Sequence, residues 1–289
     1  MTDNPITSHY TSEDALERID RHLREQGIDP EHPTLEALAP YDNFHSRGLG
    51  ATLDLIALAG FANDARVLDV GGGMGGPARV LADRSGAHVT VLDLTPAFVT
   101  QGRVLTERLG MSGQVDFEVG DGTAMPFADA SFDGVLTQHS SMNIENKEAL
   151  YAEIHRVLKP GGRLVLHDVM AGNGEPLAYP VPWAGDSTFS FLRSAAEIRA
   201  LIADSGFREL AWEDESAKVR AFLDRGQGSS PAERSGPAQQ PPGQMILFGP
   251  AFIERIQNFG RNLAAGRLVV IQALFERGPS EPAETDTSN

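Results

Sequence analysis

Apolar positions along the middle of the chain follow two alternating patterns. Short apolar runs of strand length lie at 67–70, 89–92, 115–119, 134–137, 164–167, 209–212 and 267–275. Stretches with helical spacing lie between or after them, at 77–85, 96–109, 147–158 and 195–205. Alternation of this kind predicts right-handed crossovers between parallel strands, with helices on both faces of the sheet. We therefore predict a doubly wound α/β fold with a mostly parallel, seven-stranded sheet.

The N-terminal fifty residues have a different pattern. Residues 11–25 begin with polar capping residues and continue with apolar residues at helical spacing, which predicts a capped amphipathic helix. Three prolines, the last of them Pro40, then interrupt the chain, and a short linker leads to a buried helix over 51–60. We assign residues 1–50 to an N-terminal helical lid segment.

The main domain is expected to extend over residues 51–276. Residues 216–266 form a Pro-rich cap insertion before the last strand. Within it, 225–244 is rich in Gly, Ser, Pro and Gln, which predicts a mobile loop. Residues 277–289 are expected to be a disordered tail.

Composition excludes several classes of function. The formal charge of −16 disfavours binding to nucleic acid, because no local basic patch offsets it. The absence of cysteine excludes disulfides, thiolate-bound zinc, iron–sulfur clusters and a cysteine nucleophile. Neither a signal peptide nor an apolar window of membrane-spanning length is present, so we expect a cytoplasmic protein without a membrane partner.

A glycine-rich loop joins the first expected strand to the following helix. Residues 67–76 read Val-Leu-Asp-Val-Gly-Gly-Gly-Met-Gly-Gly, which permits close approach of a ligand to the backbone. Gly71, Gly73 and Gly76 fit the dinucleotide pattern G-x-G-x-x-G, whereas Asp69 with alternate glycines fits D-x-G-x-G-x-G. Asp93, about twenty residues on, suits ribose hydroxyls in both cases and does not discriminate.

Three further features favour a methyl-donor cofactor over a dinucleotide. An anionic Asp69 would repel a pyrophosphate but could hold the α-ammonium of S-adenosylmethionine, directly or through water. In the segment Gly120-Asp121-Gly122-Thr123, the Asp121 carboxylate can accept a hydrogen bond from an adenine amino group. Finally, no tyrosine has a lysine four positions later, which rules out a dehydrogenase of the Tyr-x-x-x-Lys type.

Together these motifs resemble those of the class I S-adenosylmethionine-dependent methyltransferases, over about residues 41–276. The resemblance includes Leu-Lys-Pro-Gly-Gly-Arg-Leu at 158–164, which also fits a type II turn. It implies a Rossmann-like fold in which the glycine loop and Asp93 hold the cofactor, with Leu94 beside the adenine. The residues we expect to bind the cofactor are Ser46, Arg47, Asp69, Gly71, Gly73, Asp93, Leu94, Asp121, Gly122, Thr123 and Gln138.

Two segments are similar to a narrower group. Residues 43–48 and 138–144 resemble parts of the glycine, sarcosine and dimethylglycine N-methyltransferases, and more loosely of phosphoethanolamine and quinone-type methyltransferases. This resemblance implies a small-molecule acceptor. It leaves open whether nitrogen, oxygen or carbon receives the methyl group.

Polar residues end the fourth and fifth expected strands, where ligands bind in doubly wound sheets. Gln138 and His139 end one, and His167 and Asp168 end the other, so both pairs could face the transferred methyl group. His139 is our candidate for substrate contact or proton removal; the alternative is a hydrogen bond to a loop backbone. For His167 and Asp168 we favour anchoring of the next loop over catalysis.

The lid segment contributes further candidates. We place His45, Ser46 and Arg47 over the cofactor, with Arg47 available to its carboxylate; the alternative is a plain helix-entry turn. Five aromatic residues could line a substrate pocket, although such residues more often pack in a core: Tyr41, Phe44, Trp183, Phe189 and Phe191. We expect the substrate-binding set to be Tyr41, His45, Asn143, His167 and Trp183. No spacing indicates a metal site.

Two other functions remain open at this stage. The chain could bind S-adenosylmethionine without transferring its methyl group, in a cyclase or scaffold role, or it could be a nicotinamide oxidoreductase. The N-terminal helix and the insertion could also support a homodimer.

Overall fold

The computed structural model describes residues 14–227 and 243–278, and it contains the predicted sheet. The strands are β1 (Arg66–Val70), β2 (His88–Asp93), β3 (Val115–Val119), β4 (Phe132–Gln138), β5 (Leu158–Ala171), β6 (Phe207–Asp214) and β7 (Leu268–Arg277). Their order is β3-β2-β1-β4-β5-β7-β6, and β7 pairs antiparallel with both neighbours. The doubly wound, mostly parallel, seven-stranded fold is thus confirmed.

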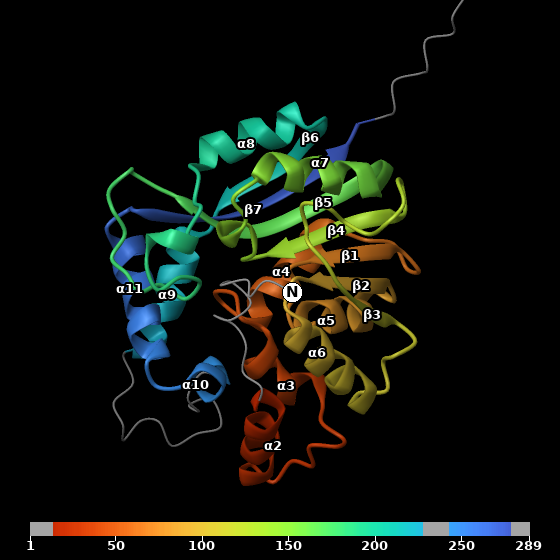
Figure 1. Cartoon of the computed structure of the whole chain (residues 1–289), viewed down its shortest axis with the longest axis vertical. Coiled ribbons are helices and arrows are strands. Elements are labelled where there is room, and N and C mark those ends of the chain that lie inside the picture. Colours follow the sequence, from red (N-terminus) through yellow and green to blue (C-terminus); the bar gives the residue numbers. More distant parts are fainter. Residues whose placement is uncertain (1–13, 228–242, 279–289) are drawn as a thin grey trace, which may run out of the picture.

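Helices cover both faces of this sheet (Figure 1). The main ones are α4 (Leu49–Ala59), α5 (Gly76–Ser85), α6 (Pro96–Arg108), α7 (Lys147–Val157) and α8 (Ala195–Asp204). Apolar side chains of α7 and α8 pack on one face, and those of α4, α5 and α6 pack on the other. Phe127, Phe132 and Phe207 lie in or against the first of these cores, as the sequence predicts. Burial of these apolar stripes stabilises the layers.

The carboxyl ends of β4, β5 and β6 meet at one edge of the sheet. His167 on β5 and Glu213 on β6 both pair with Gln272 of the intervening β7. The backbone N–H of Glu215, the residue after β6, donates to the carbonyl of Val270 at 2.8 Å. Glu215 therefore lies close to the polar residues near the carboxyl ends of β4 and β5.

The N-terminal segment contains a helix that the sequence analysis did not predict. α2 (Ala15–Glu25) agrees with the expected amphipathic helix, whose first residues, 11–13, lie outside the described range. It is followed by α3 (Leu35–Asp42), which contains Pro40 in its last turn. The expectation that proline breaks the chain here was wrong. The Thr34 side chain accepts a hydrogen bond from the Ala37 N–H at 3.2 Å and caps this helix.

The insertion before β7 is largely helical in its described part. It forms α9 (Ser216–Gln227), α10 (Gly243–Phe248) and α11 (Phe252–Ala264), so the prediction of a loop extending to residue 244 was wrong at both ends. α9 and α11 lie side by side at the edge of the sheet (Figure 1). The rest of the predicted loop, 228–242, and the tail from 279 lie outside the described residues. Among the helices that are described, none is both long and apolar enough to span a membrane.

A buried ion pair joins the N-terminal helices to the main domain. The Arg79 guanidinium on α5 donates to the Asp42 carboxylate at 2.5 Å, and both side chains are almost fully buried. A second guanidinium nitrogen donates to the Thr106 hydroxyl on α6 at 2.8 Å. Burial raises the pKa of Asp42, and Arg79 opposes that shift. The pair therefore fixes α3 of the lid segment against α5 of the main domain.

The hydroxyl of Thr106 provides a test of this joint. We expect Thr106→Val, which keeps the volume, to lower the free energy of unfolding by about 1.5–3 kcal/mol, since a buried bond to a charged group is lost. Thr100→Val on the same helix is the control, because the Thr100 hydroxyl is exposed and bonds only locally to Pro96. Urea unfolding measures both. Equal losses in the two variants would contradict the assignment.

Candidate functional site

The glycine loop after β1 is held by the end of β2. The Asp93 carboxylate accepts from the N–H groups of Gly73 and Thr95, both at 2.8 Å, and the Gly71 N–H donates to the carbonyl of Leu92 at 2.8 Å. Burial raises the pKa of Asp93, and these backbone donors oppose that shift. Asp93 thus shapes the loop. Its expected contact with a ribose stays a prediction.

Gly71 needs to be glycine for two reasons. Its φ angle is +71°, and an added β-carbon would lie 2.5 Å from the β-carbon of Ser140. Gly110 has the same angle, +70°, but no neighbouring atom within 4 Å. We expect Gly110→Ala to cost about 1 kcal/mol of stability, and Gly71→Ala roughly 1–3 kcal/mol more because of the clash. Calorimetric melting of both variants separates the cost of the φ angle from the cost of the clash with Ser140. Equal melting temperatures would exclude the clash.

Asp69 is a buried carboxyl group without a compensating charge. Its side chain is 1% exposed, and its Oδ2 atom has no hydrogen-bond partner in the described residues. Burial and the nearby Asp93 raise the pKa of Asp69 to about 8. The sequence argument treated Asp69 as an anion, and this needs correction. At neutral pH the group is protonated until a cation approaches it.

The segment after β3 forms a compact turn. The Asp121 carboxylate accepts from the backbone N–H of Thr123 at 2.7 Å and from its hydroxyl at 2.8 Å. A β-carbon at Gly122 would meet Leu150 and Val70 at 3.2–3.3 Å, so glycine allows this turn to pack closely. Asp121 is exposed, and Leu94, after β2, is half-buried. The expected adenine contacts of Asp121, Gly122, Thr123 and Leu94 stay predictions.

Three histidines gather at the carboxyl edge of the sheet. The rings of His139 and His167 are stacked with centroids 5.1 Å apart, and His45 of the lid segment lies 6.2 Å and 6.3 Å from them. His45 and His167 are buried and His139 is half-buried, with a φ angle of +48°. The backbone N–H of His139 donates to the carbonyl of His167 at 2.9 Å. The structure thus brings together His45, His139 and His167 from three separate parts of the sequence.

Burial keeps these imidazoles neutral. It lowers the pKa of His45 to about 4 and that of His167 to about 3, and it lowers the pKa of His139 well below its ordinary value, with neighbouring histidines adding to the last two shifts. A ring nitrogen of His139 lies 3.1 Å from the Ser46 hydroxyl. A neutral imidazole has one ring nitrogen free to accept a proton, so the cluster can serve as a base.

Polar side chains connect the lid segment to the end of β4. The Thr52 hydroxyl on α4 lies 2.9 Å from Nε2 of His45 and 3.2 Å from Oε1 of Gln138. The buried Nε2 amide nitrogen of Gln138 has no partner in the described residues. Gln138 and Ser46 therefore lie beside the histidines, as their positions in the sequence indicate. Their expected contact with the cofactor stays a prediction.

Neighbouring residues at the end of β5 have different roles, because successive side chains on a strand point to opposite faces. Asp168 accepts from the backbone N–H groups of Ser141 and Val169 at 3.1 Å and 2.8 Å. It anchors the loop after β4, whereas the favoured interpretation expected it to anchor the loop that follows its own strand. His167 does not anchor that loop through its ring. Neither ring nitrogen has a hydrogen-bond partner in the described residues.

An ion network borders the histidines on the cap side. Arg47 pairs with both Glu215 and Asp54, and the Lys218 ammonium is 2.9 Å from Glu215. Glu215 is fully buried, and its Oε2 atom lies 3.6 Å from Nε2 of His167. The Arg47 guanidinium is thus engaged by carboxylates of the protein itself, and its expected contact with the cofactor carboxylate stays a prediction. The sequence analysis missed Glu215, although it follows the sixth strand.

Three residues expected to bind substrate are parts of the packed structure. Tyr41 is 1% exposed among α2 and α3, where its hydroxyl meets His22. Trp183 is 2% exposed, packs on Phe259 of α11, and donates from its indole to a serine hydroxyl. The Asn143 amide donates to the carbonyls of Trp183 and Phe189 at 3.1 Å and 2.9 Å. Tyr41 and Trp183 thus pack in the core and do not line the expected aromatic pocket, whereas the expected substrate contact of Asn143 stays a prediction.

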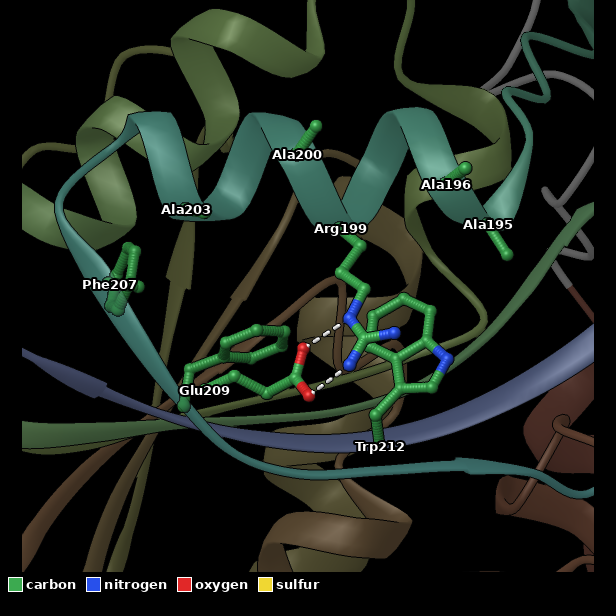
Figure 2. Close-up of a pocket in the computed structure, with 9 residues that line it drawn as sticks. Ala195, Ala196, Arg199, Ala200, Ala203, Phe207, Glu209 and Trp212 are labelled. Atoms are coloured by element: carbon green, nitrogen blue, oxygen red, sulfur yellow. Dashed lines mark hydrogen bonds and ion pairs between the residues drawn. The ribbon is translucent and has the colours of Figure 1, made fainter.

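An apolar groove of about 510 Å³ lies away from this site (Figure 2). It is bounded by α8 and β6, with Trp212 in its floor and the Arg199 guanidinium 5.2 Å above that ring. It is not at the carboxyl edge where the motifs gather. Within residues 14–227 and 243–278, no set of three His, Cys, Asp or Glu side chains is arranged to hold a metal ion.

Comparison with known proteins places the motifs in a family context. Residues 68–166 match the model of a methyltransferase domain. The chain is 44% identical over 97 residues to a sterol 24-C-methyltransferase of Gibberella zeae, covering 34% of this chain and 26% of that protein. It is 28% identical over 178 residues to phosphoethanolamine N-methyltransferase 1 of Arabidopsis thaliana, covering 62% and 36%. The chain thus matches between about a quarter and a third of these relatives' lengths.

A solved structure agrees with the fold over almost the whole chain. It is a geranyl diphosphate C-methyltransferase from Streptomyces coelicolor, with a TM-score of 0.68 and 17% identity, covering 96% of this chain and 99% of that one. At this identity the likeness concerns the fold alone. Together with the domain match, it confirms the class I fold that the motifs at residues 67–76 and 158–164 resemble.

Proposed function

We propose that this chain, which carries a class I S-adenosylmethionine-dependent methyltransferase domain, transfers a methyl group from that cofactor to a small-molecule acceptor. The observation that carries the proposal is the combination of a methyltransferase domain match over residues 68–166 with a cluster of neutral histidines at the carboxyl edge of its sheet. The relatives are named for acceptors as different as sterols and phosphoethanolamine. The identity of the acceptor is therefore a question for experiment.

The residues at the edge fit such a cofactor. Asp69 offers a buried carboxyl oxygen that has no hydrogen-bond partner among residues 14–227 and 243–278, which suits a cationic amino group. Gln138 offers a buried amide N–H that has no partner within the same ranges, which suits an acceptor oxygen. The backbone of the Gly71–Gly73 turn and the carboxylate of Asp93 complete the group of residues that would hold the cofactor. When bound, the cofactor supplies an electrophilic methyl group on a sulfonium sulfur.

The protein's own contribution is to position the acceptor and to accept its proton. His139 follows β4 directly, is held neutral by burial, and lies against Ser46 of the lid segment. We assign it to proton removal from a hydroxyl or carbon acid, and the proton moves to a ring nitrogen of His139. An amine that arrives unprotonated needs no such base. The lid segment and the cap helices exclude water from this edge.

Product formation from labelled cofactor tests the proposal. Purified full-length protein is incubated with methyl-labelled S-adenosylmethionine and panels of sterols, phenols, prenyl diphosphates and amines. The expected result is S-adenosylhomocysteine together with a labelled acceptor from one panel. Tight cofactor binding without S-adenosylhomocysteine in any panel would favour the role in which the cofactor is bound but its methyl group is not transferred. Binding of NAD(H) alone would instead favour an oxidoreductase.

A further inference from the structure

Glu215 is a fully buried carboxylate contributed from the cap side of the site. It is the first residue after β6, and its backbone N–H is held by Val270 of β7. Its two oxygens face different groups. Oε1 accepts from the Lys218 ammonium at 2.9 Å, whereas Oε2 pairs with Arg47 and lies 3.6 Å from Nε2 of His167.

Two cations of the ion network pair with this carboxylate. Arg47 carries one positive charge and is shared with Asp54 of α4. Lys218 carries another and is shared with the exposed Glu213. The two cations therefore face three carboxylates, which leaves one net negative charge beside His167. Because His167 is buried and neither ring nitrogen has a hydrogen-bond partner in the described part of the chain, the Glu215 oxygen determines which nitrogen favours the proton.

We propose that Glu215 is a positioning residue, which holds His167 with its proton on Nε2 and stabilises positive charge on the stacked His139. The first half of this statement concerns the protein alone. The second half rests on the proposed function: one proton passes from the acceptor to a ring nitrogen of His139, and its bonding electron pair stays on the acceptor atom. Glu215 neither gains nor loses a proton. Its negative charge offsets the imidazolium across the stacked pair.

Every charged or titratable neighbour of the histidine pair enters this balance. His45 and Arg47 face it from the lid segment, and Glu215 faces it from the cap. Removing the Glu215 charge takes the network from one net negative charge to zero, because Arg47 and Lys218 then face only Asp54 and Glu213. An imidazolium at His139 then becomes less favourable. This sign of the effect differs from that of a purely structural ion pair, whose loss would loosen the fold without changing the strength of the base.

Nitrogen-15 NMR of histidine-labelled full-length protein at pH 7 tests the first half. His167→Gln assigns the His167 signals by their loss. We expect wild type and the control Glu213→Gln, which removes only the exposed partner of Lys218, to show a proton on Nε2 of His167. Glu215→Gln is expected to lose this preference. A proton on Nδ1 in wild type, or unchanged signals in a folded Glu215→Gln protein, would overturn the proposal.

The pH dependence of turnover tests the second half. In Glu215→Gln we expect the acidic limb of kcat to move to lower pH by about one unit, and kcat at pH 7 to fall about tenfold, because the base is weaker. Glu215→Asp keeps the charge, so it should restore most of the activity and serves if the glutamine variant fails to fold. An unshifted limb in a folded Glu215→Gln protein, or a limb shifted as far in Glu215→Asp, would overturn the second half. If wild type transfers no methyl group, the proposed function fails, while the NMR result still decides the tautomer.

Discussion

Replacing Asp69 with Asn is expected to weaken binding of S-adenosylmethionine by about 100- to 1000-fold, as loss of one member of a buried ion pair does. The wild-type carboxyl group is buried, has one oxygen without a partner, and has a pKa of about 8. A cationic ligand must therefore displace its proton. Isothermal titration calorimetry in buffers of different ionisation enthalpy should show that binding at pH 7 releases close to one proton.

The pH dependence gives this prediction a clear sign. As the pH increases towards 8, the affinity of wild type for the cofactor should rise by about tenfold per pH unit, because the proton on Asp69 becomes easier to remove. Asp69→Asn should have no such slope. Asp83→Asn, an exposed carboxyl group on α5, is the control and should bind like wild type. Equal affinity in all three proteins, with no proton released, would exclude Asp69 as the cation site.

The same residue affects stability in the opposite direction. Because the pKa of Asp69 is raised on folding, the folded chain holds a proton that the unfolded chain loses above about pH 4. Stability is therefore lost as the pH rises from about 4 towards 8. Between pH 4 and pH 8, wild type should therefore lose on the order of 1–4 kcal/mol more free energy of unfolding than Asp69→Asn does. Denaturant melts at the two values of pH measure this difference.

Much of the fold followed from local patterns. Most of the parallel strands are short β-branched runs bounded by turn residues, and the helices between them have clear apolar stripes, so their positions were predictable to within a few residues. The exception is β5, which was predicted over 164–167 and extends over Leu158–Ala171. α3 was missed because a proline was expected to break the chain. In the structure Pro40 lies in the last turn of this short helix, so it interrupts little of the helix. The cap helices were missed because Gly and Pro dominated the composition of a segment whose flanks are helical.

The site was predictable where a strand ends and unpredictable where packing decides. Gln138, His139 and His167 were found because the carboxyl ends of parallel strands form the binding edge. The same rule applied to β6 would have found Glu215. The aromatic candidates failed for another reason. Tyr41 and Trp183 are core residues of the helices around the edge, and only tertiary contacts distinguish a ring that lines a pocket from one that fills a core.

Replacing His139 with Asn is expected to lower kcat by about 100- to 10,000-fold if the acceptor is a hydroxyl or a carbon acid, which is the usual contribution of a positioned general base. Asn is the best substitution here because His139 has a φ angle of +48°, a conformation that Asn tolerates better than Ala. Cofactor affinity should stay within a factor of two of wild type. His32→Ala, at an exposed histidine on the lid segment, should leave both quantities unchanged.

The pH profile distinguishes this role from a merely structural one. Burial holds the pKa of His139 well below 6.5, so the neutral base is fully present at pH 7 and wild-type kcat should be flat from pH 7 upwards, falling only in acid. In His139→Asn that acidic limb should disappear together with most of the rate. If kcat is unchanged at every pH, His139 is not the base. The variant thus tests the assignment of the base directly.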